Sequence, residues 1–213
     1  MTDTRKRNVL LDFGYVLTSA QDASVFDPVL DELGLKRNAF LGAWGLHRAA
    51  YDCGSLDARA YWSLVLGDAG ATGAAPWLDG NLDRLGRTDL AAWSRPRRVM
   101  HDLVARLVDA GVPVGILSNM PAGAGRLWMD LWPALDRVAF KLWSGDEGVS
   151  KPDPAIYKLF IERSGWLPED TLFVDDVERN IDAARALGFK VHLFRTEDAA
   201  AKAVSAWARL PQA

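Results

Sequence analysis

The chain of 213 residues is 49% hydrophobic and 25% charged, a composition typical of a folded globular protein that argues against disorder. Its formal net charge is -3 and its basic residues are scattered, so we expect no nucleic-acid partner. Because no run of 18 apolar residues occurs, we expect no membrane-spanning segment either.

The first predicted strand is a short apolar run, Val9–Phe13, which follows a polar and charged N-terminal stretch. Asp12 interrupts this run, which disfavours an export signal, and we expect a cytoplasmic protein. A carboxylate among apolar neighbours is costly unless it is paired or bound to a cation. Asp12 is therefore either a structural residue that caps a turn or part of a reactive site.

After Tyr15 the strand signals stop, and helical patterns dominate as far as about Trp93. The predicted helices are Asp27–Leu33, Ala39–Tyr51, Leu56–Leu66 and Pro76–Arg84. Helices inserted directly after a first strand predict a cap domain at residues 16–93, set over the sheet edge where ligands bind. The core domain would then comprise residues 1–15 and 94–213.

Beyond the cap, short apolar runs alternate with helical patterns. Strands are predicted at Val112–Leu117, Val138–Trp143 (the weakest), Thr171–Val174 and Val191–Phe194, and helices at Val99–Asp109, Pro154–Ser164, Glu178–Leu187 and Ala199–Ala208. Apolar runs without polar alternation are typical of strands covered on both faces. The predicted fold class is α/β, a doubly wound, Rossmann-like parallel sheet with an inserted helical cap.

Polar residues stand at the ends of three further predicted segments. Ser118 and Asn119 follow the second strand, Lys151 precedes a Pro-Asp-Pro helix start, and Asp175 and Asp176 close the fourth strand. Each alone has an ordinary explanation, namely a turn, a surface lysine or a helix cap. Two carboxylates about 4 Å apart repel by roughly 4 kcal/mol at an effective dielectric near 20, a cost that a divalent cation offsets. Since parallel strands end at one edge, these residues and the first aspartate should form one pocket suited to phosphoryl transfer.

In order and spacing, the segments DFGYVL, ILSN, SKPDPAIY and FVDDVERNIDAARALG resemble the four motifs of the haloacid dehalogenase (HAD) superfamily, and the inserted helices resemble its small cap. The resemblance spans the whole chain. It implies an enzyme that hydrolyses the phosphate monoester of a small phosphorylated metabolite, with Asp12 attacking phosphorus to form an aspartyl-phosphate. It also implies that Ser118 and Asn119 hold the phosphoryl oxygens, and that Lys151 neutralises charge on Asp12 and the transferring group.

The same resemblance implies a Mg²⁺ cofactor, held by Asp12, the Gly14 backbone carbonyl, Asp175 and Asp176. The family usually has a second aspartate, the general acid and base, where this chain has Gly14. Losing such a group typically costs about 10²- to 10⁴-fold in rate. Gly14 therefore leaves three alternatives open: a slow or selective phosphatase, a proton supplied by a cap residue or water, and a binding or regulatory protein that has lost turnover.

A 2-haloacid dehalogenase is a further alternative, because it would share the fold and Asp12. Dehalogenases of the family lack the acidic pair, since their chemistry needs no metal, so the Asp175-Asp176 pair favours phosphate. The sequence contains no P-loop, dinucleotide fingerprint, Gly-x-Ser-x-Gly elbow or metal-binding histidine spacing. Nothing between Tyr15 and Trp93 carries a recognisable specificity signature, and we expect a monomer or homodimer.

Overall fold

The computed structural model describes residues 7–210, apart from the side chains of residues 129–131, 133 and 134. Residues 1–6, which contribute to the expectation that the chain is not exported, lie outside the described part. Within residues 7–210, none of the helices is both long enough and apolar enough to cross a membrane.

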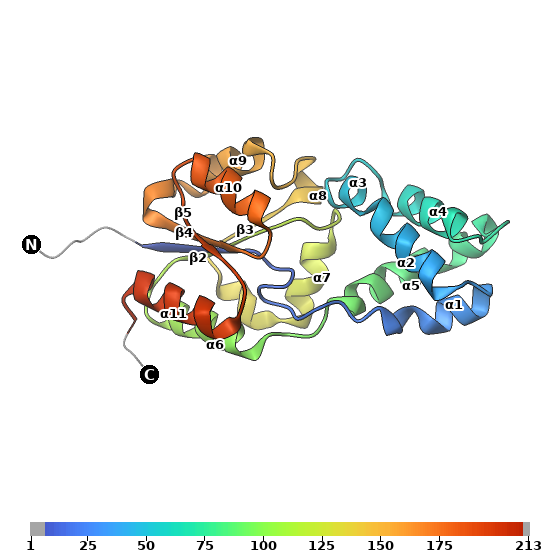
Figure 1. The fold of residues 1–213 in the computed structure, drawn as a ribbon, viewed down its shortest axis with the longest axis horizontal. Coiled ribbons are helices and arrows are strands. Elements are labelled where there is room, and N and C mark those ends of the chain that lie inside the picture. The colour runs from blue at the N-terminus through green and yellow to red at the C-terminus, as the bar shows by residue number, and fades with distance from the viewer. Residues whose placement is uncertain (1–6, 211–213) are drawn as a thin grey trace, which may run out of the picture.

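The centre of the larger part is a sheet of five parallel strands in the order β3-β2-β1-β4-β5 (Figure 1). The strands are β1 Asn8–Leu11, β2 Val114–Ser118, β3 Phe140–Trp143, β4 Thr171–Asp175 and β5 Lys190–Leu193. They match the predicted strands to within about two residues at each end. The chain reverses its direction of travel across the sheet between β1 and β4, the point where open α/β sheets bind ligands.

Helices cover both faces of this sheet, because side chains of a strand alternate between its two faces. Val9 and Leu11 are fully buried in one hydrophobic cluster, beneath α6 and α11, and Leu10 is fully buried in another, beneath α9 and α10 (Figure 1). These helices are α6 Arg98–Asp109, α9 Pro154–Ser164, α10 Glu178–Ala186 and α11 Glu197–Ala208. The predicted doubly wound fold is confirmed.

The segment inserted after β1 is helical and has a hydrophobic core of its own, with Phe26, Phe40 and Trp62 at 0% exposure. Its elements are η1 Ala23–Phe26, α1 Asp27–Leu33, α2 Arg37–Leu46, α3 Arg48–Asp52, α4 Ala58–Asp68 and α5 Ala75–Ala92. Figure 1 shows this helical cap beyond the carboxyl ends of the strands. Two antiparallel linkers connect it to the sheet, with Ser19 N donating to Arg95 O at 2.8 Å. The exact domain limits at residues 16 and 93 stay a prediction.

The structure differs from the sequence prediction in four helical segments. The prediction of one helix over Ala39–Tyr51 was wrong, because α2 ends at Leu46 and α3 begins at Arg48. Two glycines, Gly42 and Gly45, weaken the last turns of α2. Helix α5 runs on to Ala92, well beyond its predicted end, while α7 Ala124–Leu131 and the short α8 Ser144–Glu147 were not predicted. The remaining 3-10 turns are η2 Pro133–Arg137 and η3 Pro168–Asp170.

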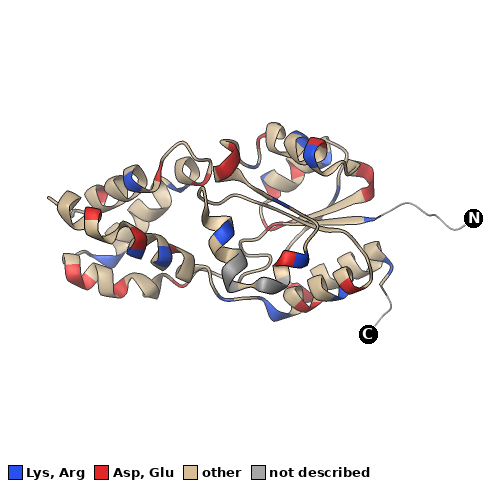
Figure 2. Cartoon of the chain, turned by 180° about the vertical axis from the view of Figure 1, so that it is seen from behind, with Lys and Arg blue, Asp and Glu red and all other residues tan. Residues whose placement is uncertain are grey.

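Acidic and basic residues are interspersed along the helices of both parts (Figure 2). Several of them pair locally at the surface, as Arg137 does with Asp109 at 2.7 Å and Arg163 with Glu147. Exposed pairs of this kind contribute little to stability, about 0–1 kcal/mol each. The charges that carry more weight are the buried ones at the carboxyl edge of the sheet.

Candidate active site

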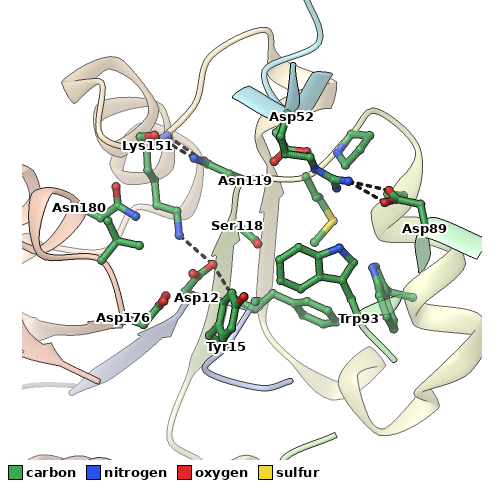
Figure 3. A pocket seen from close by; sticks show the side chains of 18 of the residues that line it. Asp12, Tyr15, Asp52, Asp89, Trp93, Ser118, Asn119, Lys151, Asp176 and Asn180 are labelled. Carbon is green, nitrogen blue, oxygen red and sulfur yellow. Dashed lines mark hydrogen bonds and ion pairs between the residues drawn. The ribbon is translucent and has the colours of Figure 1, made fainter. Parts of the chain in front are cut away.

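Asp12 is the first residue after β1 and lies at the carboxyl edge of the sheet. Its backbone N–H donates to Val174 O at 2.9 Å, which places it beside the end of β4. A cavity of about 200 Å³ opens at this point, lined by Asp12 and other residues of the sheet edge and by cap residues. Figure 3 shows Asp12, Ser118, Lys151 and Asp176 around this one cavity. The structure therefore brings together the predicted site residues from all four motifs.

Lys151 is the buried cation of the site, with a side chain only 1% exposed. Its ammonium group lies 2.8 Å from Asp12 Oδ1, and it donates to Asp175 Oδ2 at 2.7 Å and Leu117 O at 2.9 Å. Three acceptors use its three protons, so the ammonium is held in one orientation. Burial acts to lower the pKa of Lys151, but the two carboxylates together raise it above its usual value. The group therefore stays charged.

Asp175 is fully buried, and each of its carboxylate oxygens already accepts two hydrogen bonds. Oδ1 accepts from Val177 N at 2.8 Å and Asn180 Nδ2 at 3.0 Å, while Oδ2 accepts from Lys151 Nζ at 2.7 Å and Asn180 Nδ2 at 3.1 Å. Asn180 is itself buried at the start of α10. Asp175 thus uses its hydrogen-bonding capacity to position Lys151 rather than facing the cavity.

Asn119 and Ser118 differ in what their side chains do. Asn119 Nδ2 donates to Lys151 O at 2.8 Å, and its Oδ1 accepts from Lys151 N at 2.8 Å. This two-point contact fixes the backbone of the third motif against the second. Ser118 is 2% exposed and lines the cavity, and its hydroxyl has no hydrogen-bond partner among the described residues. Ser118 is therefore available to a ligand, and the predicted phosphoryl contact of Asn119 stays a prediction.

Asp12 and Asp176 are the acidic side chains of the sheet edge that line the cavity. Burial raises the pKa of Asp12 to about 7, with Lys151 opposing the rise and Asp175 adding to it. Burial also raises the pKa of Asp176, again with a contribution from Asp175. Two such carboxylates favour a nearby cation, which would return both to their ionised forms.

Oxygen atoms of Asp12, Asp175 and Asp176 lie within 4.8 Å of one another, a spacing that suits one divalent cation. Of the three, Asp12 and Asp176 face the cavity. The carbonyl oxygen of Gly14 accepts from Val16 N at 2.7 Å and keeps a second lone pair for a ligand. The donor set is all oxygen, as Mg²⁺ prefers.

Gly14 lies under an aromatic residue that comes from the cap linker. A Cβ added at Gly14 would lie 3.5 Å from Cζ3 of Trp93. The next residue, Tyr15, has φ 56°, a left-handed conformation that costs a non-glycine residue about 1–2 kcal/mol. Its ring packs edge-on against Trp93 with the ring centroids 5.5 Å apart. Trp93 therefore occupies the space beside Gly14, the position where the family usually has its general acid.

The cap adds a polar group to the cavity that the sequence analysis missed. Arg48 donates to Asp52 Oδ1 at 2.7 Å and to both oxygens of Asp89 at 2.8 Å. Trp44 Nε1 donates to Asp89 as well, at 2.9 Å. No sequence signal could have found this cluster, because Arg48 and Asp89 lie on different helices, 41 positions apart. Figure 3 shows Asp52 and Asp89 across the cavity from Asp12.

Comparison with known proteins decides the family. A sequence model of the haloacid dehalogenase-like hydrolases matches residues 59–188, which is more than half of the chain. The chain belongs to the haloacid dehalogenase-like hydrolase family. A phosphoglycolate phosphatase of Xylella fastidiosa is 33% identical over 95 residues, which are 45% of this chain and 42% of that protein. The chain spans less than half the length of curated relatives such as this one.

Two solved structures of HAD family members share the fold over nearly the whole chain. A predicted HAD-like hydrolase of Porphyromonas gingivalis has a TM-score of 0.75 at 19% identity, covering 98% of this chain and 100% of that one. A HAD family enzyme of Bacteroides thetaiotaomicron, in complex with magnesium and inorganic phosphate, has a TM-score of 0.70 at 20% identity, covering 89% and 94%. At these identities the likeness establishes a common fold.

Proposed function

We propose that this HAD family member is a Mg²⁺-dependent phosphatase that hydrolyses a small phosphate monoester through an aspartyl-phosphate on Asp12. The observation that carries the proposal is the buried Lys151 ammonium, which joins Asp12 and Asp175 beside a cavity that Ser118 and Asp176 also line. A nucleophile, a fixed cation, a hydroxyl donor and an oxygen-rich cation site are the parts that phosphoryl transfer needs.

Each residue of the core has a distinct task in this reaction. Asp12 supplies the carboxylate oxygen that attacks phosphorus, and Lys151 beside it balances the negative charge of nucleophile and phosphoryl group. Ser118 donates its hydroxyl to a phosphoryl oxygen. Asp12, Asp176 and the Gly14 carbonyl would hold Mg²⁺, which supplies charge neutralisation at the transferring group. Asp175, predicted from sequence as a direct ligand, acts in this proposal by positioning Lys151.

The carboxylate of Asp176, which lines the cavity, favours a phosphatase over a dehalogenase. Dehalogenation needs no metal, and an ionised carboxylate beside Asp12 would only repel the nucleophile and the carboxylate of a haloacid. The cavity of about 200 Å³ lies below the roughly 300–1,000 Å³ of sites for drug-sized ligands, which favours a small metabolite. Phosphatases among the relatives and the magnesium and phosphate in a structural neighbour support the same reaction class.

A screen of phosphorylated metabolites, with and without Mg²⁺, tests the proposal. We expect turnover that requires the metal and that falls by about 10⁴-fold or more in Asp12→Asn, which keeps the shape of the side chain but removes the nucleophile. Turnover that survives in Asp12→Asn would contradict the proposal. Mg²⁺-dependent binding of beryllofluoride without hydrolysis of any ester would instead identify a regulatory protein that has lost turnover, and halide release from a 2-haloacid without Mg²⁺ would identify a dehalogenase.

A further inference from the structure

The cap carboxylates Asp52 and Asp89 share a single guanidinium group, that of Arg48. With both carboxylates ionised, the cluster carries one excess negative charge. Its side chains are largely buried, at 19% exposure for Arg48, 15% for Asp52 and 7% for Asp89. An excess charge is costly in such a place, and one bound proton removes it. The cluster is therefore built to take up and release a proton.

The two carboxylates are not equivalent, and the proton belongs on Asp52. Both oxygens of Asp89 accept from Arg48, and Oδ1 accepts from Trp44 as well. Asp52 accepts only at Oδ1, and its Oδ2 has no hydrogen-bond partner among the described residues. Burial, with a contribution from Asp89, raises the pKa of Asp52 to about 6 against the lowering effect of Arg48. Asp52 lines the same cavity as Asp12.

The position of Asp52 over the sheet edge is fixed by contacts between the cap and the core. Its backbone carbonyl, at the end of α3, accepts a hydrogen bond from Ser144 Oγ at the start of α8. Ser144 Oγ in turn accepts from Met120 N at 3.0 Å, just beyond the end of β2. Two residues after Asp52, Gly54 packs so closely on Gly145 that an added Cβ would lie 2.6 Å from Gly145 O. The chain at Asp52 and just after it therefore packs on the core.

Among the described residues, the core offers no further carboxylate for the proton transfer. Gly14 has none, and Trp93 packs beside it. In the proposed phosphatase, Asp12 is the nucleophile and Asp176 binds the metal. Among the described carboxylates that line the cavity, this leaves Asp52 as the one with a free oxygen.

We propose that Asp52, from the cap, is the general acid and base that replaces the missing core aspartate, an assignment that rests on the proposed phosphatase function. As the bond between Asp12 and phosphorus forms, the ester P–O bond breaks and the Asp52 proton passes to the leaving oxygen. In the second half, the Asp52 carboxylate takes a proton from the water that attacks phosphorus. The bond to Asp12 then breaks, inorganic phosphate leaves, and Asp52 is protonated for the next turn.

A series of aryl phosphates in the presence of Mg²⁺ tests this assignment on the whole chain, cap and core together. Phenyl, para-nitrophenyl and dinitrophenyl phosphate have leaving groups that need successively less protonation. In Asp52→Asn, kcat/KM should fall about 10²- to 10⁴-fold for phenyl phosphate and stay near the wild-type value for dinitrophenyl phosphate. With the base removed as well, dinitrophenol should appear as a burst of about one equivalent followed by slow turnover.

Three comparison variants make the result specific. Asp52→Glu restores a carboxyl group and should recover a shallow dependence on the leaving group. Tyr15→Phe removes a hydroxyl group of another cavity-lining residue and should keep the wild-type dependence of kcat/KM on the leaving group. When log kcat/KM is plotted against the pKa of the leaving group, parallel lines for wild type and Asp52→Asn would overturn the role of Asp52. If all activity is also lost in Asp12→Asn, the proposed phosphatase function would still stand. If the wild type hydrolyses no ester with Mg²⁺, both proposals fail.

Discussion

Replacing Lys151 by methionine removes a buried cation from the sheet edge while keeping the length and packing of its apolar stem. Asp12 and Asp175 then lose their ion pairs, at 2.8 and 2.7 Å, and Leu117 O loses its donor. Breaking a buried pair by removing one partner costs about 3–5 kcal/mol, because the remaining charge is left uncompensated. We therefore expect Lys151→Met to lose about 4 kcal/mol of unfolding free energy near neutral pH, a large share of the total for a domain of this size.

Urea denaturation without divalent cations measures this loss, and the tryptophan fluorescence of the nine indole side chains reports it. The matched control is a double-mutant cycle with Asp175→Asn, which removes the second charge of the pair. The double variant should recover about 1–3 kcal/mol relative to the sum of the two single changes. An exposed ion pair contributes up to about 1 kcal/mol. A loss of unfolding free energy below that value for Lys151→Met would contradict the conclusion that the Lys151 ammonium forms buried ion pairs.

Three further outcomes are expected. Asn180→Ala, which removes the amide that donates to both oxygens of Asp175, should cost about 1–3 kcal/mol in urea denaturation, and wild-type stability would show that the amide does not hold Asp175. Gly54→Ala places a Cβ 2.6 Å from Gly145 O at a residue with φ 75°, so the α3 amides should exchange hydrogen faster, and unchanged exchange would speak against the tight cap contact. Burial raises the pKa of Asp52 from 3.8 to about 6, so its stabilisation is full below about pH 4 and lost as pH rises through about 6. Between the low and the high end of this pH range, the unfolding free energy of wild type, measured by urea denaturation, should fall by up to about 3 kcal/mol more than that of Asp52→Asn. An equal pH dependence of the two proteins would contradict the raised pKa.

The strands and the core of the site could be predicted from sequence because their signals are local. A buried parallel strand is a short apolar run, and the reactive residue directly follows it, as Asp12 follows β1 and Ser118 ends β2. Parallel strands all end at one edge, so the sequence positions alone place these side chains together. Lys151 was predicted in the same pocket although the preceding strand, β3, ends at Trp143, and the loop before α9 brings it to the cavity.

The division of labour within the motifs could not be predicted, because it depends on hydrogen bonds between distant segments. Asp175 and Asp176 are equivalent in sequence, yet Asn180 and Lys151 saturate the first and leave the second facing the cavity. Asn119 looks like a phosphoryl ligand in its motif, but its amide pairs with the backbone of a residue 32 positions away.

The cap cluster of Arg48, Asp52 and Asp89 could not be predicted either, because its hydrogen bonds also join distant segments. Asp89 is a buried polar residue in the part of α5 that lies beyond the predicted helix end at Arg84. Its partners Arg48 and Trp44 lie on α3 and α2. Helical periodicity finds apolar faces and cannot find a buried ion pair whose partners are on other helices.

The central claim, that Asp12 carries the phosphoryl group, is tested most directly by trapping that group. The protein is mixed with Mg²⁺ and dinitrophenyl phosphate, quenched in acid within the first turnover, digested and analysed by mass spectrometry. We expect one added phosphoryl group on the peptide that contains Asp12, and none in Asp12→Asn. A phosphoryl group on any other residue, or product formation with no labelled peptide at any quench time, would contradict the account.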